Sequence, residues 1–199
     1  MQREMVIGRS AAIMIEVVRD IAPDQLEAPT PCADYNVRQL VNHLLFWAPS
    51  LAGAGRKDPV PPPAASDVET DLTAGDWAAK LEADLSRVVA AWSDPAAWSD
   101  PAAWDGGTRL GGPDAMPAAM IGGMVCTELV IHGWDLARAT GQKPDWDEDV
   151  VAFAYTELEA TAEQGRQMGV YGPPVVVPAT ASILKRALGL SGRDPAWSR

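Results

Sequence analysis

Residues 124–141 read MVCTELVIHGWDLARATG, and this stretch decides the fold because it predicts one long helix. We expect that helix to run from about Ala115 to Ala139, since Gly141 is typical of the position just after a helix end. Glu128 and His132 stand four residues apart in it, so their side chains project from one face a single turn apart. Two ligands placed in this way can hold one metal ion without any rearrangement of the backbone.

The chain has only one other histidine, His43, and it lies in a second predicted helix beside Leu40, Leu44 and Trp47. His43, Glu128 and His132 together offer two imidazoles and a carboxylate. This is the ligand set of a metal site that keeps an open position for water or substrate. An ordinary structure also accounts for these residues, because i, i+4 Glu/His pairs occur on solvated helix faces and a mid-helix histidine is often a hydrogen-bonded core residue.

The apolar surroundings of Glu128 favour the metal site over the ordinary structure. A carboxylate among Val125, Leu129, Val130 and Ile131 is costly to bury unless it is paired or binds a cation. Asp135 follows three residues after His132, close to the same face. It is a candidate to accept the free ring N–H of a ligating histidine and so to orient the ring. A solvated Asp135, or one paired with Arg138, is an equally good interpretation.

The two cysteines, Cys32 and Cys126, have different expected roles. A reducing compartment argues against a structural disulfide between them. Cys126 precedes Glu128 by two residues and points away from it, so we interpret it as a small buried hydrophobe. Cys32 lies in a proline-flanked loop before the His43 helix, where it is a candidate soft ligand or reactive thiol near the site.

The rest of the chain predicts an all-α fold of four or five long helices joined by loops of uneven length, which suits a bundle. Strand signals are confined to Val175–Val177, and residues 92–104 (WSDPAAWSDPAAW) are expected to form a duplicated loop. The other expected elements are a helix over 3–21, a helix that starts at Asn36 with a capping box to Gln39 and ends near Pro49, a proline-rich linker over 56–66, a helix capped by Asp76 and reaching Trp92, a helix from Asp147 to about Met168, and a short helix over 180–188.

Length and charge exclude several function classes. The chain has 199 residues, so we expect a single domain over residues 1–199. The net charge of −11 repels phosphate backbones, so we expect no nucleic-acid partner. No apolar run reaches the length needed to span a bilayer, and the first residues lack the features of a signal peptide, so we expect a cytoplasmic protein. Phosphate-cradling glycine loops and Gly-x-Ser-x-Gly elbows are absent from the sequence.

Several of these residues resemble a known family. Residues 30–32 (TPC) and 35–44 (YNVRQLVNHL) are similar to the opening motif of the N-terminal domain of mycothiol-dependent maleylpyruvate isomerase, and residues 128–141 closely resemble its second motif. The ending, residues 171–173 (YGP) and 192–197 (GRDPAW), looks like that of a single-domain actinobacterial subgroup of metal-binding proteins. The similarity extends from about Ile13 to Trp197.

The resemblance implies a DinB-like fold, an up-down-down-up four-helix bundle with additional short helices and long Pro/Gly-rich loops. The metal ligands of the family carry over onto His43, Glu128 and His132. Zinc is the metal that the resemblance implies, with nickel as an alternative, because histidine and carboxylate ligands do not separate the two. The isomerase itself has a further C-terminal domain, and we expect this chain to end too soon after the bundle to contain a full copy.

Two functions of different classes are compatible with the sequence. The first is an isomerase or transferase that uses a divalent metal and a low-molecular-weight thiol such as mycothiol on a small electrophilic substrate. Asp135 would orient a ligand, and Arg38 or Arg138 would be candidates to hold an acidic substrate. The second is a non-catalytic module that binds a metal or a small ligand. Helical bundles often form dimers through apolar surface, so a homodimer is an open possibility, although the sequence does not show which face would form the interface.

Overall fold

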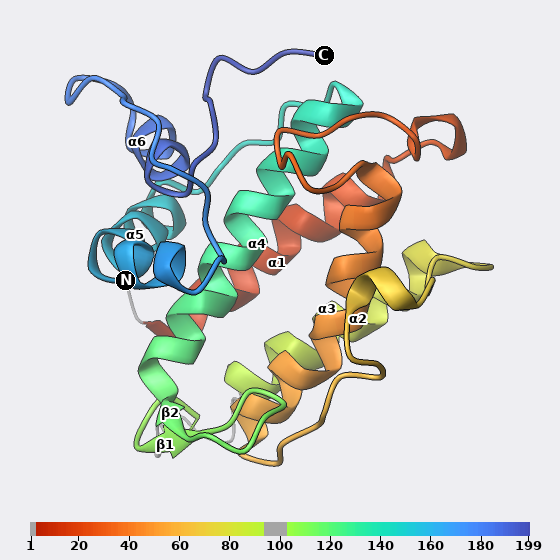
Figure 1. Cartoon of the computed structure of the whole chain (residues 1–199), viewed down its shortest axis with the longest axis vertical. Helices are drawn as coiled ribbons and strands as arrows, with labels where there is room; N and C mark the ends of the chain where they lie inside the picture. The colour runs from red at the N-terminus through yellow and green to blue at the C-terminus, as the bar shows by residue number, and fades with distance from the viewer. Residues whose placement is uncertain (1–2, 94–102) are drawn as a thin grey trace.

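The fold is all-α, as the sequence predicts, with one very short pair of strands (Figure 1). The computed structural model describes residues 3–93 and 103–199. The helices and strands are α1 (Arg3–Arg19), η1 (Pro23–Gln25), α2 (Val37–Arg56), η2 (Asp67–Glu69), α3 (Trp77–Trp92), β1 (Gly107–Thr108), β2 (Met116–Pro117), α4 (Ala118–Thr140), α5 (Glu148–Gln167) and α6 (Ile183–Leu190).

Four long helices form the bundle that positions the site. In the view of Figure 1, α1 and α4 rise while α2 and α3 descend, which is the up-down-down-up order that the resemblance implies. Helix α1 packs against α3 and α4, and α2 packs against the same two helices, so α2 and α4 are neighbours. Helix α5 covers α4, and α6 packs on α5. The bundle thus places His43 on α2 beside Glu128 and His132 on α4.

The helix ends follow the polar residues that the sequence places there. Asn36 accepts the Gln39 N–H while the Gln39 side chain accepts the Asn36 N–H, so the expected capping box is present. Asp76 and Asp147 cap α3 and α5 with their carboxylates. Gly141 follows α4 with φ of 76°, a left-handed conformation that glycine adopts without steric cost.

The prediction that α2 ends near Pro49 is wrong, because the helix continues for seven further residues to Arg56. Proline within a helix removes one hydrogen bond and crowds the preceding turn, at a cost of about 3 kcal/mol. The second half of α2 offsets this cost by burial, since Leu51, Ala52 and Ala54 are all at least 92% buried. Gly55 allows the helix to lie directly against Ala91 and Trp92 at the end of α3.

The one stretch with strand signals, residues 175–177, belongs to no strand among the described residues. The Val175 N–H instead donates to the Gly189 carbonyl at 2.9 Å. The observed strands, β1 and β2, are an antiparallel pair that closes the chain reversal before α4. The expected duplicated loop falls largely on residues 94–102, which lie outside the described residues. Its flanking tryptophans belong to the core, where the Trp104 indole N–H donates to the Trp92 carbonyl at 3.0 Å.

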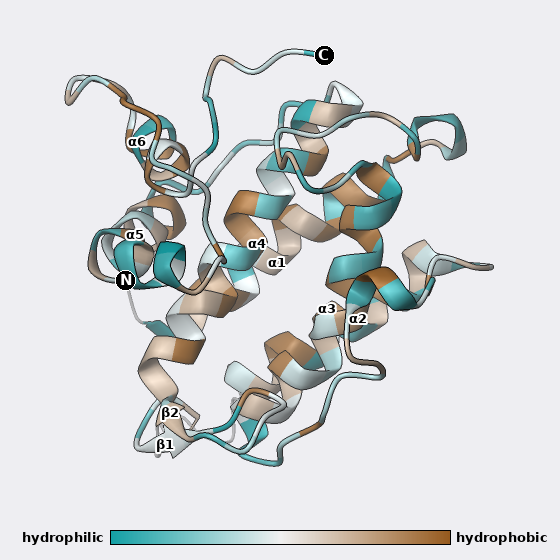
Figure 2. Ribbon diagram, in the orientation of Figure 1, coloured by the Kyte–Doolittle hydropathy of each residue, from teal (hydrophilic) through white to brown (hydrophobic). Residues whose placement is uncertain are grey.

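Hydrophobic residues concentrate on the helices, and the connecting loops are mostly hydrophilic (Figure 2). One continuous core joins α1 to α6, with the fully buried side chains of Met14, Leu40, Leu129 and Leu158 among its members. Over residues 3–93 and 103–199, none of the helices combines the length and the apolar character that a membrane crossing requires.

Candidate metal centre

The three predicted ligands come together between α2 and α4. Suitable ligand atoms of His43, Glu128 and His132 all lie within 4.8 Å of one another. The Nε2 atom of His43 is 3.0 Å from Oε1 of Glu128, and Nε2 of His132 is 3.5 Å from the same oxygen. The two imidazole rings meet edge to face with centroids 5.3 Å apart. Two ring nitrogens and a carboxylate therefore converge on one point.

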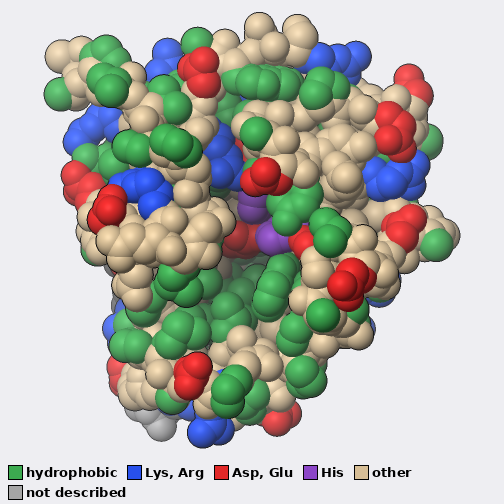
Figure 3. All heavy atoms as spheres, viewed as in Figure 1, with side chains coloured by type: hydrophobic (Ala, Val, Ile, Leu, Met, Phe, Trp, Pro, Cys, Tyr) green, Lys and Arg blue, Asp and Glu red, His purple; other side chains and the backbone are tan. Residues whose placement is uncertain are grey.

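This point is reachable from outside the protein. The side chains of His43, Glu128 and His132 keep 17%, 26% and 11% of their surface exposed. In the space-filling view the histidines and acidic side chains lie at the base of a hollow in the face of the bundle (Figure 3). A ligand or substrate can therefore approach the converging atoms without any change of the main chain.

Behind His132 lies a buried ion pair. Nδ1 of His132 is 3.0 Å from Oδ2 of Asp135, which is the contact expected from their spacing on the helix. The sequence reasoning named Arg138 as a partner for Asp135, but the structure places Arg193 there, with Nη2 3.0 Å from Oδ2. The Arg193 and Asp135 side chains are 9% and 0% exposed, so their charges neutralise each other away from water.

Behind His43 lies a second carboxylate that the sequence reasoning missed. Nδ1 of His43 is 2.7 Å from Oδ2 of Asp67, a residue of η2. The Tyr35 hydroxyl donates to the same oxygen at 3.0 Å. Asn42 holds this segment in place by donating from its side-chain amide to the carbonyls of Asp67 and Thr70. The Ser66–Asp67 pair was the available signal, because serine caps a short helix that an acidic residue begins.

The two carboxylates decide which ring nitrogen carries the proton in each histidine. An ionised carboxylate only accepts hydrogen bonds, so Asp67 and Asp135 each require an N–H at Nδ1 of their histidine. In the neutral rings, both Nε2 lone pairs then face Glu128. Three electron-rich atoms so close together repel one another unless a positive charge lies among them. This arrangement fits a divalent cation, since metal-ligating histidines ordinarily donate their other N–H to a carboxylate.

The charges of the site also shift the pKa values of its members. Burial raises the pKa of Glu128, but the neighbouring His132 and His43 outweigh it and lower that pKa to about 2. Burial by itself lowers the pKa of His43, and the carboxylates of Glu128 and Asp67 more than reverse this, so the pKa of His43 is raised. The site therefore holds its carboxylate ionised and attracts a positive charge to the ring nitrogens.

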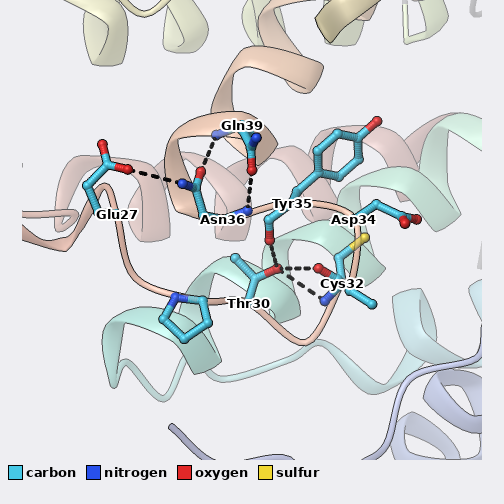
Figure 4. A pocket seen from close by; sticks show the side chains of 9 residues that line it. Glu27, Thr30, Cys32, Asp34, Tyr35, Asn36 and Gln39 are labelled. Atoms are coloured by element: carbon cyan, nitrogen blue, oxygen red, sulfur yellow. Dashed lines mark hydrogen bonds between the residues drawn. The ribbon is translucent and has the colours of Figure 1, made fainter.

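Cys32 does approach the centre, as the sequence suggests. Its sulfur, a nitrogen of His132 and an oxygen of Asp135 lie within 4.8 Å of one another. Thr30 holds the loop by donating to the Tyr35 carbonyl at 2.7 Å and accepting the Cys32 N–H at 3.1 Å (Figure 4).

The surroundings of Cys32 disfavour a soft ligand or a reactive thiol. Burial raises the pKa of Cys32 to about 11, so the thiol stays protonated at neutral pH. Arg193 already supplies the positive charge beside Asp135, which opposes a second cation there. Cys126 is a buried free thiol, as predicted, and burial raises its pKa to about 12.

Arg38 and Arg138, the two candidates for holding an acidic substrate, make their contacts elsewhere in the described part of the chain. Arg38 pairs with Glu27 at 2.8 Å and donates to the Thr73 hydroxyl. Arg138 donates to the Trp197 carbonyl and lies over the ring of Trp134. The geometry therefore brings neither arginine to the converging ligands.

The fold and the donor set define an all-α bundle protein with a His-Glu-His centre between two of its helices. The family described as "Mycothiol maleylpyruvate isomerase N-terminal domain" matches residues 7–137. The chain belongs to this family. The match includes the three converging residues and Asp135, and it confirms the resemblance found in the sequence.

Two solved structures and two curated proteins are similar to the chain. A mutant and another form of mycothiol-dependent maleylpyruvate isomerase superpose with TM-scores of 0.66 and 0.63, and at 14% identity they bear on the fold. Each likeness covers 96% of this chain and 89% of the other, so it extends beyond the bundle helices. Two uncharacterized proteins of Mycobacterium tuberculosis, from strains CDC 1551 and H37Rv, are 28% identical over 134 residues. The match spans 67% of this chain and 65% of each relative.

Proposed function

We propose that the protein is a divalent-metal-dependent enzyme that uses a low-molecular-weight thiol of the mycothiol type to isomerise, or transfer the thiol to, a small electrophilic substrate. The observation that carries the proposal is the donor set, in which two Nε2 atoms and one Glu128 oxygen converge while each Nδ1 rests on a carboxylate. Family membership supports mycothiol as the thiol, since the family is described as the N-terminal domain of mycothiol maleylpyruvate isomerase.

His43, Glu128 and His132 would hold the metal, with zinc as the first candidate and nickel as the second. A divalent cation held there would supply the positive charge that keeps a thiol ionised, and hence nucleophilic, at neutral pH. The protein's own contribution is the fixed direction of the two rings. Asp67 and Asp135 hold each Nδ1–H, so that both Nε2 lone pairs point to one place before any ligand arrives.

Half-buried apolar side chains continue from the ligands along both helices. On α4, Met124 and Met120 precede Glu128 by one and two turns on the same face, and on α2 Trp47 follows His43 by one turn. Figure 3 shows hydrophobic side chains covering the part of the hollow next to the histidines. These surroundings support a small substrate with an apolar portion, because such a surface favours apolar groups over charged ones.

Calorimetric titration of the zinc-loaded protein with mycothiol tests the proposal. We expect saturable binding near one thiol per chain, which disappears in the metal-stripped protein and when S-methylated mycothiol replaces the free thiol. The methylated compound is the matched control, because it keeps the rest of the molecule and loses only the ionisable S–H proton. Failure of the zinc-loaded protein to bind the free thiol at millimolar concentration would favour a non-catalytic metal-binding module.

A further inference from the structure

We propose that Arg193 is a positioning residue of the centre, which fixes the His132 ring by holding Asp135, and that the segment after α6 is therefore part of the site. The proposal rests on the proposed function for the metal ion that His132 would bind. The contacts among Arg193, Asp135 and His132 are those of the protein itself. Neither the spacing of the ligands nor the family match over residues 7–137 points to this residue.

Arg193 is buried and contacts both carboxylate oxygens of Asp135, unlike an arginine on the protein surface. Its Nη2 lies 3.0 Å from Oδ2 of Asp135, and its Nε lies 3.3 Å from the same oxygen and 3.4 Å from Oδ1. Nη1 donates to the Ser191 carbonyl at 3.2 Å, which ties the guanidinium to its own turn of chain. With both charged side chains almost fully buried, the planar guanidinium fixes the direction of the carboxylate as well as its charge.

The effect passes from Arg193 to the metal ligand through shared atoms. Oδ2 of Asp135 receives the Arg193 guanidinium and also lies 3.0 Å from Nδ1 of His132. Without the guanidinium, the Asp135 carboxylate loses the hydrogen bonds that fix its direction and can turn away from Nδ1 of His132. Nδ1 of His132 then has no fixed acceptor, so the ring proton is free to occupy Nε2, where it would block the metal.

The segment that carries Arg193 is held against α4 and the end of α6 by further bonds. Arg199 donates to the Ala139 carbonyl at 3.3 Å, and Arg193 itself donates through its backbone N–H to the Leu188 carbonyl at 2.9 Å. Gly192, with φ of 85°, approaches Gly172 so closely that a Cβ there would lie 3.0 Å from the Gly172 backbone. The turn that delivers the guanidinium is thus fixed by its own backbone.

The test compares Arg193→Met with Arg166→Met, each of which removes one arginine from the C-terminal part of the fold. Arg166 donates to the Leu190 carbonyl at 3.0 Å and pairs with Glu163, so it supports the same segment without contacting Asp135. The first readout is the tautomer of each imidazole in the metal-free protein, from ¹⁵N spectra of histidine-labelled samples. Only His43 and His132 contribute signals, because the chain has two histidines. The second readout is zinc affinity by competition with a chelator.

We expect Arg193→Met to lose the Nδ1–H form of one imidazole, the one missing in His132→Ala, and to bind zinc about 10- to 100-fold more weakly. Arg166→Met should keep both Nδ1–H signals and wild-type affinity. Unchanged tautomers and affinity in a folded Arg193→Met, or an equal loss in Arg166→Met, would overturn the proposal. If Arg193→Met does not fold, Arg193→Lys keeps the positive charge but lacks the planar guanidinium. The same two readouts then decide whether the guanidinium fixes the His132 ring.

If the wild-type protein binds no zinc, the proposed function fails while the tautomer comparison in metal-free protein still tests Arg193. If zinc and mycothiol bind normally but the Arg193→Met tautomers match those of the wild type, the function stands and the positioning role falls.

Discussion

The two histidines of the centre are held by carboxylates of different origin. Nδ1 of His132 contacts Asp135, three residues later on the same helix, and a buried arginine forms an ion pair with that carboxylate. Nδ1 of His43 contacts Asp67, 24 residues away on a separate short helix, and a tyrosine hydroxyl donates to the Asp67 carboxylate. The Asp135 side chain is fully buried, whereas that of Asp67 is 13% exposed. The His132 half thus takes its carboxylate from its own helix, whereas the His43 half takes its carboxylate from a segment docked onto the bundle.

Removing a ligand from each half should have the largest effect. We expect His132→Ala to abolish stoichiometric zinc binding, because Glu128 is then the one ligand that remains on α4. His43→Ala should also lower the zinc content, but it leaves the Glu128–His132 pair intact on one helix turn, so weak binding should persist. Elemental analysis of each purified variant after incubation with zinc and desalting measures the difference. Wild-type zinc content in His132→Ala would contradict the assignment of the whole centre.

Replacing the carboxylate beside each histidine, one at a time, should lower the free energy of unfolding by different amounts in the two halves. Asp135→Asn leaves the buried guanidinium of Arg193 without its counter-charge, and breaking such a pair costs about 3–5 kcal/mol in the free energy of unfolding. Asp67→Asn loses charged hydrogen bonds at a partly exposed position and should cost about 1–3 kcal/mol. Urea denaturation of the metal-free proteins compares them directly. Equal losses would mean that the buried contacts of Asp135 contribute no more to the free energy of unfolding than the partly exposed contacts of Asp67.

The sequence predicts well the residues that one helix brings together and predicts poorly the residues that irregular segments bring to the centre, for a physical reason. Helical periodicity fixes the relative directions of Glu128, His132 and Asp135, so their convergence follows from spacing alone. Asp67 and Arg193 reach the site only through the tertiary path of irregular segments, and no period in the sequence encodes that path. Pro49 failed as a signal for the same kind of reason, since packing of Leu51 and Ala54 outweighs a local preference.

The pH dependence of the metal-free protein should show how Glu128 joins the two halves. The folded pKa of Glu128 is lowered to about 2, so its contribution to stability is present above its unfolded pKa near 4.5 and is lost as the pH falls towards 2. The pKa of His43 is raised, so its contribution is present below its unfolded value and is lost as the pH rises through the folded one.

Urea denaturation of chelator-treated protein between pH 3 and pH 9 measures both limbs. Glu128→Gln should flatten the acid limb and weaken the alkaline one, because the carboxylate is a partner of both rings. Glu159→Gln, which removes a carboxylate from the exposed face of α5, is the control for the loss of one negative charge. An acid limb that is equally steep in Glu128→Gln and in wild type would show that the stability change arises elsewhere in the protein.

Removing the hydroxyl behind His43 should have the smallest effect and should act on one half alone. Tyr35→Phe keeps the ring, whose centroid lies 5.1 Å from that of the His43 ring, and removes the hydroxyl that donates to Asp67 and lies 3.3 Å from Nδ1 of His43. A single hydrogen bond to a charged group contributes about 1.5–3 kcal/mol, and water can replace part of it at this partly exposed position. We therefore expect a loss of zinc affinity of a few-fold, measured by chelator competition. Because Asp135 and Arg193 are untouched, the ¹⁵N signals of His132 should not move while those of His43 do. A shift of both imidazoles would mean that the two halves are coupled through Glu128 strongly enough to behave as one unit.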